Sequence, residues 1–146
     1  MCSDINIRNC SAKDIERILE IENECFEHPY PEYVFLEYLD SDLFLVAENE
    51  ETIVGYIITD VRENEGVIIS ISVDTPFQRN GIGRTLIEKT IERLSTEYVV
   101  LTVRVNNESA QRFYEKLGFD QFYVINEYYK NDEDAIVMGK HLSNNE

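Results

Sequence analysis

Basic side chains are scarce in this 146-residue chain, which carries 13 lysines and arginines against 29 aspartates and glutamates, for a formal net charge of −16 at pH 7. Nucleic-acid binding depends on clustered Lys and Arg that contact phosphates, so the deficit disfavours a nucleic-acid binder and favours a basic protein or peptide as partner. Long apolar runs are also missing, because the longest are strand-sized, far below the ~18 residues of a membrane span. The amino terminus lacks the basic and apolar stretches of a signal peptide. We therefore expect a cytoplasmic protein that does not bind membranes.

Cysteine and histidine are rare as well. The chain has an odd number of cysteines, three, at positions Cys2, Cys10 and Cys25, and none has the Cys-x-x-Cys spacing. This argues against a disulfide framework and against a zinc site. Cys10 and Cys25 are better interpreted as small buried side chains than as nucleophiles, because neither His28 nor His141 comes with a triad-like signature. No metal site is expected.

The length suits one domain, which we expect over residues 1–142, followed by a polar tail at 143–146. The apolar pattern predicts the order β-α-α-β-β-β-α-β-α-β-β. This order indicates an α/β (mixed α+β) fold, in which a mixed central sheet has helices on both faces. The expected strands cover residues 5–7, 43–48, 53–59, 67–73, 99–103, 122–128 and 135–141, and the expected helices follow 15–26, 33–39, 82–94 and 108–117.

The most informative motif lies where the apolar strand 67–73 leads, through a short linker, into Gln78-Arg79-Asn80-Gly81-Ile82-Gly83-Arg84 and an amphipathic helix. Two glycines at a loop-to-helix junction let the backbone approach a ligand, and the unpaired N–H groups and positive dipole of the first turn suit a phosphate or pyrophosphate. A dinucleotide fingerprint would need a third glycine where Leu86 stands, and the P-loop spacing is absent. An ordinary loop-to-helix junction is the alternative.

A second segment, 103–119 (VRVNNESAQRFYEKLGF), follows the strand at 99–103. Together with the glycine loop it resembles the GNAT superfamily of acetyl-CoA-dependent N-acetyltransferases. Within that superfamily the chain is most similar to the N-terminal (Nα) protein acetyltransferases, of both the bacterial ribosomal-protein alanine type and the archaeal type. The ending 126–138 (NEYYKNDEDAIVM) looks like theirs too. The resemblance implies a transferase that moves the acetyl group of acetyl-CoA to the α-amino group of protein N-termini, by direct attack in a ternary complex.

The resemblance also implies where acetyl-CoA binds. The backbone of Ile71, Ser72 and Val73 pairs with the pantetheine arm and helps polarise the thioester carbonyl. Asn107 matches a further cofactor-contacting position, although a helix cap alone accounts for it equally well. The pyrophosphate is expected on Gln78, Arg79, Asn80, Gly81, Ile82, Gly83 and Arg84.

Two side chains are candidates for proton transfer. Tyr114 matches the family's phenol near the sulfur, and a hydroxyl with a pKa near ~10 can protonate a thiolate whose conjugate acid is near ~8.5; a core aromatic is the alternative. Glu32, in Pro31-Glu32-Tyr33, resembles the glutamate that archaeal and eukaryotic Nα-acetyltransferases present to the amine; a carboxylate facing the helix dipole is the alternative. The bacterial enzymes carry a glutamate where this chain has Thr102, which cannot act as a base at neutral pH. That difference favours Glu32 or an ordered water as the base, with His28 as a further option.

The substrate side is expected to be aromatic. Tyr128 and Tyr129 match the paired tyrosines of the family's peptide groove, and Tyr30 could form its opposite wall. The expected partner is a protein or peptide N-terminus, including basic ribosomal proteins, and the protein is expected to be a monomer or homodimer. A small-amine or antibiotic acetyltransferase and a non-catalytic acyl-CoA-binding regulatory module are the alternatives. Intact Glu32 and Tyr114 argue against the regulatory module, and the tyrosine pair argues against a small amine.

Overall fold

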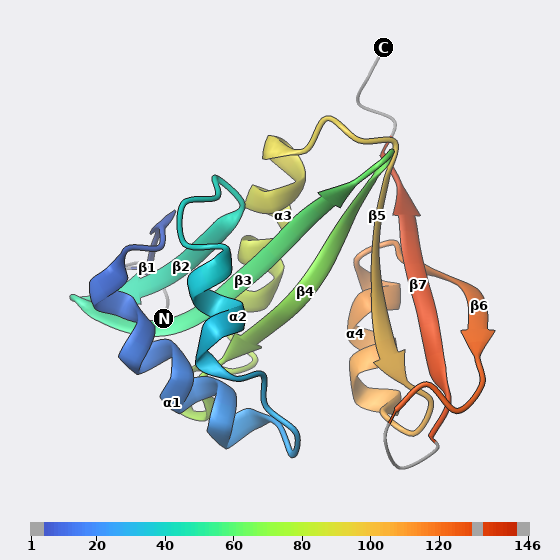
Figure 1. The fold of residues 1–146 in the computed structure, drawn as a ribbon, viewed down its shortest axis with the longest axis horizontal. Coiled ribbons are helices and arrows are strands. Elements are labelled where there is room, and N and C mark those ends of the chain that lie inside the picture. Colours follow the sequence, from blue (N-terminus) through green and yellow to red (C-terminus); the bar gives the residue numbers. More distant parts are fainter. Residues whose placement is uncertain (1–4, 130–132, 143–146) are drawn as a thin grey trace. The chain divides into compact units, whose positions relative to one another are not determined.

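The computed structural model describes residues 5–129 and 133–142. Within them the element order confirms the predicted alternation of strands and helices, with two additional 3-10 turns at Ala12–Asp14 and Thr75–Phe77 (Figure 1). The predicted tail at 143–146 lies outside the described residues, and the single domain over 1–142 stays a prediction. The elements are β1 (Ile5–Asn9), α1 (Ile15–Cys25), α2 (Glu32–Glu37), β2 (Phe44–Asn49), β3 (Thr52–Arg62), β4 (Glu65–Val73), α3 (Ile82–Arg93), β5 (Tyr98–Arg104), α4 (Glu108–Lys116), β6 (Asp120–Ile125) and β7 (Ala135–His141).

The strands hydrogen-bond in the order β1-β2-β3-β4-β5-β7-β6. Strands β1 and β2 are antiparallel, as are β2 and β3, β5 and β7, and β6 and β7, whereas β4 and β5 are parallel over Glu65–Val67 and Tyr98–Val100. The prediction of a mixed sheet is confirmed. Two compact units divide the chain: the first unit is Met1–Asp60 with Ile69–Leu94, and the second unit is Val61–Ile68 with Ser95–Glu146.

In the first unit, helices cover both faces of the strands, as the apolar pattern predicts. Helices α1 and α2 lie on one side of β2 and β3, and α3 lies on the other (Figure 1). Helix α3 turns its buried Ile82, Leu86 and Ile87 inward, because these residues recur at helical spacing. The core beneath α1 and α2 contains Ile18, Ile21, Phe35, Phe44, Val46, Tyr56 and Ile58, each fully buried.

The 3-10 turn that leads into α1 is capped by side chains. Asp14 accepts a hydrogen bond from the backbone N–H of Ser11 at 2.8 Å, which completes a reciprocal capping box between these two residues. The carboxylate of Asp14 also receives both terminal nitrogens of Arg8, at 2.8 and 2.9 Å. The N-terminal end of α1 is therefore anchored to β1.

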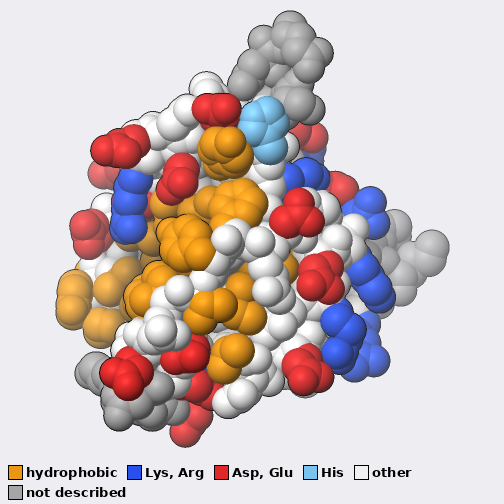
Figure 2. All heavy atoms as spheres, turned by 90° about the vertical axis from the view of Figure 1, so that its right-hand side faces the viewer, with side chains coloured by type: hydrophobic (Ala, Val, Ile, Leu, Met, Phe, Trp, Pro, Cys, Tyr) orange, Lys and Arg blue, Asp and Glu red, His pale blue; other side chains and the backbone are white. Residues whose placement is uncertain are grey.

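In the second unit, β6 is the terminal strand of the sheet and its residues are mostly exposed. Phe122, Tyr123 and Val124 expose 41%, 58% and 50% of their surface, and Figure 2 shows hydrophobic side chains gathered on this side of the protein. The predicted strand over 122–128 is wrong in its bounds, because β6 ends at Ile125. The chain turns there, since Glu127 has a left-handed φ of 54° and its N–H bonds the Asp134 carboxylate at 2.9 Å.

The second predicted helix also differs in its bounds. It was expected over 33–39, whereas α2 covers Glu32–Glu37. Beyond Glu37 the N–H groups of Tyr38 and Leu39 bond carbonyls three residues back, at 3.2 and 3.3 Å, so the last turn tightens and the helix ends. No helix of the described ranges is long and apolar enough to span a membrane.

Candidate functional site

The predicted site residues fall into two groups. The first unit contains Tyr30, Glu32, the Ile71 to Val73 strand end and the glycine loop, whereas the second unit contains Asn107, Tyr114, Tyr128 and Tyr129.

The glycine loop has the backbone geometry of an anion cradle. Gly81 is the N-cap of the 12-residue helix α3 and has a left-handed conformation, with φ of 83° and ψ of 5°. The first α-helical bond runs from the Thr85 N–H to the Gly81 carbonyl at 3.0 Å, so the N–H groups of the first turn have no partner within the helix. The first turn contains no acidic residue, and its exposed Arg84 is paired with Glu88 at 2.9 Å. This arrangement suits a phosphate group.

The start of the loop is tied to α1. The Asp74 carboxylate accepts from the Thr75 N–H at 3.0 Å and caps the 3-10 turn. Arg17 of α1 donates to the same carboxylate at 2.6 Å and to the Ile53 carbonyl at 3.2 Å. The Asp74 N–H in turn bonds the Val54 carbonyl at 2.8 Å. These bonds fix the point at which the chain leaves β4 for the loop.

The end of β4 has close neighbours on its backbone. The Val73 carbonyl accepts from the Gln78 side-chain amide at 2.8 Å, and the Cys25 thiol lies 3.7 Å from the same oxygen. A Cβ at Gly55 would lie 3.1 Å from the Ser72 carbonyl oxygen, so a glycine lets β3 approach this part of β4. Pairing of Ile71, Ser72 and Val73 with a pantetheine arm stays a prediction.

Glu32 is the first residue of α2, exposed, and without a hydrogen-bonding or ion-pair partner among the described residues. This position fits both predicted roles of Glu32, as a base that faces the substrate amine and as a carboxylate at the positive end of the helix dipole. Tyr30 is 44% exposed, and its backbone N–H donates to the Glu22 carboxylate at 2.9 Å. His28 is exposed in the same loop.

In the second unit, Asn107 caps α4, because its side-chain oxygen accepts from the Ala110 N–H at 3.1 Å. The cap predicted from the sequence is confirmed, and the cofactor contact stays a prediction. Gly118, directly after Leu117, ends the helix region with a left-handed φ of 95°, a conformation that glycine adopts readily.

Tyr114 lies on the buried side of α4. Its ring packs against Phe113 and Phe119, with centroids 5.2 and 5.7 Å away. The side chain is 9% exposed, and burial raises the pKa of Tyr114 to about 12. The phenol therefore keeps its proton throughout the neutral range, as a proton donor must, although a packed core aromatic would do so too.

Tyr128 and Tyr129 pack edge to face, with centroids 4.9 Å apart. Tyr128 is exposed, whereas Tyr129 is held by Arg104, whose guanidinium carbon lies 3.8 Å from its ring centroid. Burial raises the pKa of Tyr129, opposed by a hydrogen bond that the Thr102 hydroxyl donates to the tyrosine oxygen. Thr102 thus contacts Tyr129, one member of the tyrosine pair. Arg104 also pairs with Glu133 at 2.5 Å.

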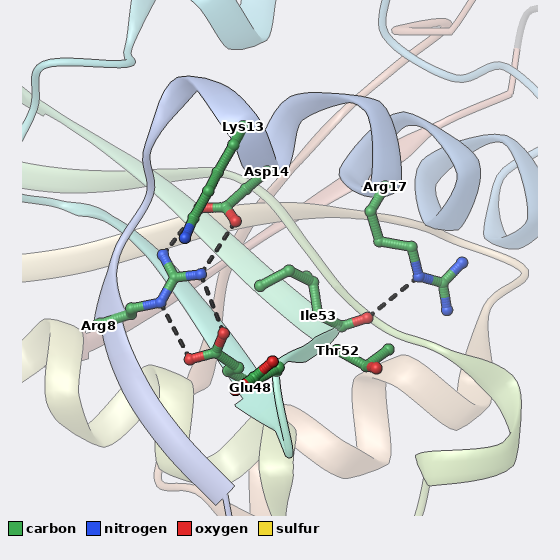
Figure 3. A pocket seen from close by; sticks show the side chains of 8 residues that line it. Arg8, Lys13, Asp14, Arg17, Glu48, Thr52 and Ile53 are labelled. Atoms are coloured by element: carbon green, nitrogen blue, oxygen red, sulfur yellow. Dashed lines mark hydrogen bonds and ion pairs between the residues drawn. The ribbon is translucent and has the colours of Figure 1, made fainter.

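A pocket of about 620 Å³ in the first unit lies near β1 and the start of α1 (Figure 3). Its arginines are already paired: Arg8 with Asp14 and Glu48, and Arg17 with Asp74 and Glu20. These pairs neutralise both arginines, and the rest of the charged lining is Lys13 together with Glu51, so the pocket offers a poor anion site. Across the described ranges, no group of three or more His, Cys, Asp or Glu side chains is placed to hold a metal ion.

The cysteines that the structure describes differ in environment. Cys10 is 8% exposed, and burial raises its pKa to about 12, which suits a small buried side chain and opposes a nucleophilic role. Cys25 is half-buried, and Cys2 lies outside the described residues.

Comparisons with known proteins identify the family. Residues 15–119 match the Acetyltransferase (GNAT) family, and the chain belongs to that family. An uncharacterized N-acetyltransferase of Methanocaldococcus jannaschii is 38% identical, over 94% of this chain and 92% of the relative. An N-alpha-acetyltransferase of Saccharolobus solfataricus is 32% identical, over 95% and 94%. A [ribosomal protein bS18]-alanine N-acetyltransferase of Salmonella typhimurium is 34% identical, over 91% and 95%.

The fold has a close counterpart among solved structures. The crystal structure of Ard1 from Thermoplasma volcanium superposes with a TM-score of 0.89 at 28% identity, covering 95% of this chain and 98% of that chain. The predicted family and fold class are therefore confirmed.

Sequence reasoning missed one buried cluster in the first unit. Glu22, on the inner face of α1, accepts hydrogen bonds from the hydroxyls of Tyr56 in β3 and Ser70 in β4. Its position beside Ile18 and Ile21 on the buried face of α1 is the one local signal that could have drawn attention to it.

Proposed function

We propose that the protein transfers the acetyl group of acetyl-CoA to the α-amino group of peptide and protein amino termini. The observation that carries the proposal is the pair of relatives named N-alpha-acetyltransferase and ribosomal-protein alanine N-acetyltransferase, which match at 32% and 34% identity over more than nine-tenths of this chain. The aromatic pair Tyr128 and Tyr129 supports a peptide over a small amine, because two packed rings offer an extended apolar wall.

The first unit contains the groups that would hold acetyl-CoA. The residues Gln78 to Arg84 supply backbone N–H groups and a positive helix end for the pyrophosphate, and the left-handed Gly81 leaves that approach open. Ile71, Ser72 and Val73 would pair with the pantetheine arm as an added strand, and Asn107 of the second unit would add a polar contact. Acetyl-CoA supplies the acetyl thioester.

The proton transfers are assigned to Glu32 and Tyr114. Glu32 would accept a proton from the amine through water, because its exposed carboxylate at the start of α2 is reachable by solvent. Tyr114 would donate its proton to the departing thiolate, since burial keeps the phenol protonated. The amine attacks the acetyl group directly in a ternary complex, so no acetyl-enzyme forms and no cysteine is required.

The substrate would be an extended amino-terminal segment, with Tyr30, Tyr128 and Tyr129 contacting its first residues. The formal net charge of −16 favours basic proteins, because an acidic surface attracts them and accelerates their association.

The experiment compares three sets of acceptors with acetyl-CoA and reads product by mass. The sets are peptides with varied first residues, the same peptides with blocked amino termini, and small polyamines and aminoglycosides. The proposal expects product from unblocked peptides only. Faster acetylation of the small amines would establish a small-amine acetyltransferase instead, and acetyl-CoA binding without any product would indicate a regulatory module.

A further inference from the structure

Glu22 carries a buried carboxylate that has no role in the proposed proton transfers. It is 2% exposed and lies near the end of α1. One oxygen, Oε1, accepts from the Tyr56 hydroxyl and from the Ser70 hydroxyl, the latter at 3.0 Å, and the other, Oε2, accepts from the Tyr30 N–H at 2.9 Å. Three donors from three different segments of the first unit thus meet at one carboxylate.

A buried carboxylate is costly unless it is hydrogen-bonded, and an apolar side chain would pack at this position more simply. Its neighbours Ile18 and Ile21 on the same face of α1 are apolar and fully buried. Glu22 therefore does something other than fill the core. With donors on both oxygens and almost no exposure, it is suited to hold segments together.

The segments that it holds are the ones assigned to the two substrates. Tyr30 lies between Pro29 and Pro31, so its N–H is the single backbone donor of that tripeptide, and Glu22 accepts it. Glu32 follows directly. On the other side, Ser70 immediately precedes the β4 residues assigned to the pantetheine arm.

We propose that Glu22 is a positioning residue, whose carboxylate fixes the Pro29-Tyr30-Pro31 loop against β3 and β4 so that Tyr30 and Glu32 meet the incoming amine. The inference rests on the proposed function. The half-buried Cys25, whose thiol lies 3.7 Å from the Val73 carbonyl, adds a second contact between the end of α1 and β4.

The test uses Glu22→Met, which keeps the side-chain length and removes both acceptors, with Glu24→Met as the matched control on the exposed side of the same helix. We expect Glu22→Met to lower kcat/KM for peptide by about 10- to 100-fold, the scale of a lost hydrogen bond to a charged group. Acetyl-CoA affinity should stay within about twofold, and Glu24→Met should resemble the wild type. If kcat/KM for peptide and the affinity for acetyl-CoA fell by the same factor, Glu22 would have a purely structural role and the proposal would be overturned.

Glu22→Gln separates positioning from proton transfer. An amide turned so that its oxygen accepts from Tyr30 can donate to the two hydroxyls, so this variant should recover activity to within about fivefold of the wild type. A Gln variant as impaired as the Met variant would contradict positioning through hydrogen bonds.

Hydrogen exchange at the Tyr30 amide tests its bond to the Glu22 carboxylate independently of activity. The measurement is informative in the wild-type protein as well as in the variants. The amide should exchange at least about 100-fold more slowly than an open chain, and Glu22→Met should remove most of that protection. Free exchange in the wild type would overturn the inference even if peptides are acetylated. A protected Tyr30 amide in a protein that acetylates no peptide would instead count against the proposed function alone.

Discussion

Replacing Gly81 by alanine tests the cradle assignment, because Gly81 has φ of 83° while a Cβ there would have no atom within 4 Å. The cost therefore comes from the backbone rather than from a clash. A left-handed conformation costs a non-glycine residue roughly 1–2 kcal/mol. For a chain of this length, that is a fall of about 2–8 °C in Tm.

The chain offers a matched control at Gly118, which has φ of 95° and lies at the other end of a helix, in the second unit. The atoms nearest to a Cβ at Gly118 would belong to the Lys140 side chain, at 3.3 Å, and not to the backbone, so Gly118→Ala should lose a similar amount of stability. The two variants thus differ in whether the substituted glycine belongs to the proposed pyrophosphate loop, and little in backbone strain.

Calorimetric titration with acetyl-CoA distinguishes them. If strain at position 81 shifts the loop and removes one charge-assisted N–H contact to the pyrophosphate, the affinity of Gly81→Ala should fall by about 10- to 100-fold. Gly118→Ala should bind as the wild type does. The reasoning is refuted if both folded variants bind acetyl-CoA with wild-type affinity, or if they lose affinity equally.

Three further predictions follow from the buried groups. Tyr114→Phe should retain acetyl-CoA affinity and slow turnover by roughly 10²–10⁴-fold when chemistry limits the rate; unchanged turnover would make Tyr114 a core residue only. Because burial raises the pKa of Cys10 to about 12, iodoacetamide at pH 7.5 should alkylate Cys25 well before Cys10 in folded protein, as peptide mapping would show; equal labelling would contradict it. Burial alone would raise the pKa of Asp14, but hydrogen bonds from Arg8 and the Ser11 backbone lower it below its ordinary value. The stability from this lowered pKa should be complete above about pH 4 and disappear as the pH falls further, and urea unfolding of Asp14→Asn should show a shallower acid slope than the wild type. An identical slope would exclude Asp14 as a source of acid sensitivity.

Features set by local sequence were predictable. The order of the elements and the Asn107 cap depend on neighbouring residues and on the backbone preferences of single residue types. The end of β6 was not predictable, because the apolar pattern continues to Tyr128, whereas the turn depends on Glu127 and its bond to Asp134.

The other features that could not be predicted from the sequence depend on long-range side-chain contacts. Glu22 reaches Tyr56 and Ser70, 34 and 48 residues away along the chain, and Arg17 reaches Asp74, 57 residues away. No periodicity marks such partners, since they become neighbours only when the sheet forms. An acidic residue on the inner face of a helix signals a buried contact without identifying what it contacts.

The central claim is that the acceptor is an α-amine, and one peptide that carries both a free amino terminus and an internal lysine tests it most directly. At pH 7 the α-amine, with a pKa of about 7.7–8.0, has a neutral fraction a few hundredfold larger than that of a lysine with a pKa of about 10.4. After limited reaction with acetyl-CoA, tandem mass spectrometry locates the acetyl group. The account predicts that nearly all of it lies on the α-amine. Acetylation of the lysine at a comparable or greater rate would contradict it.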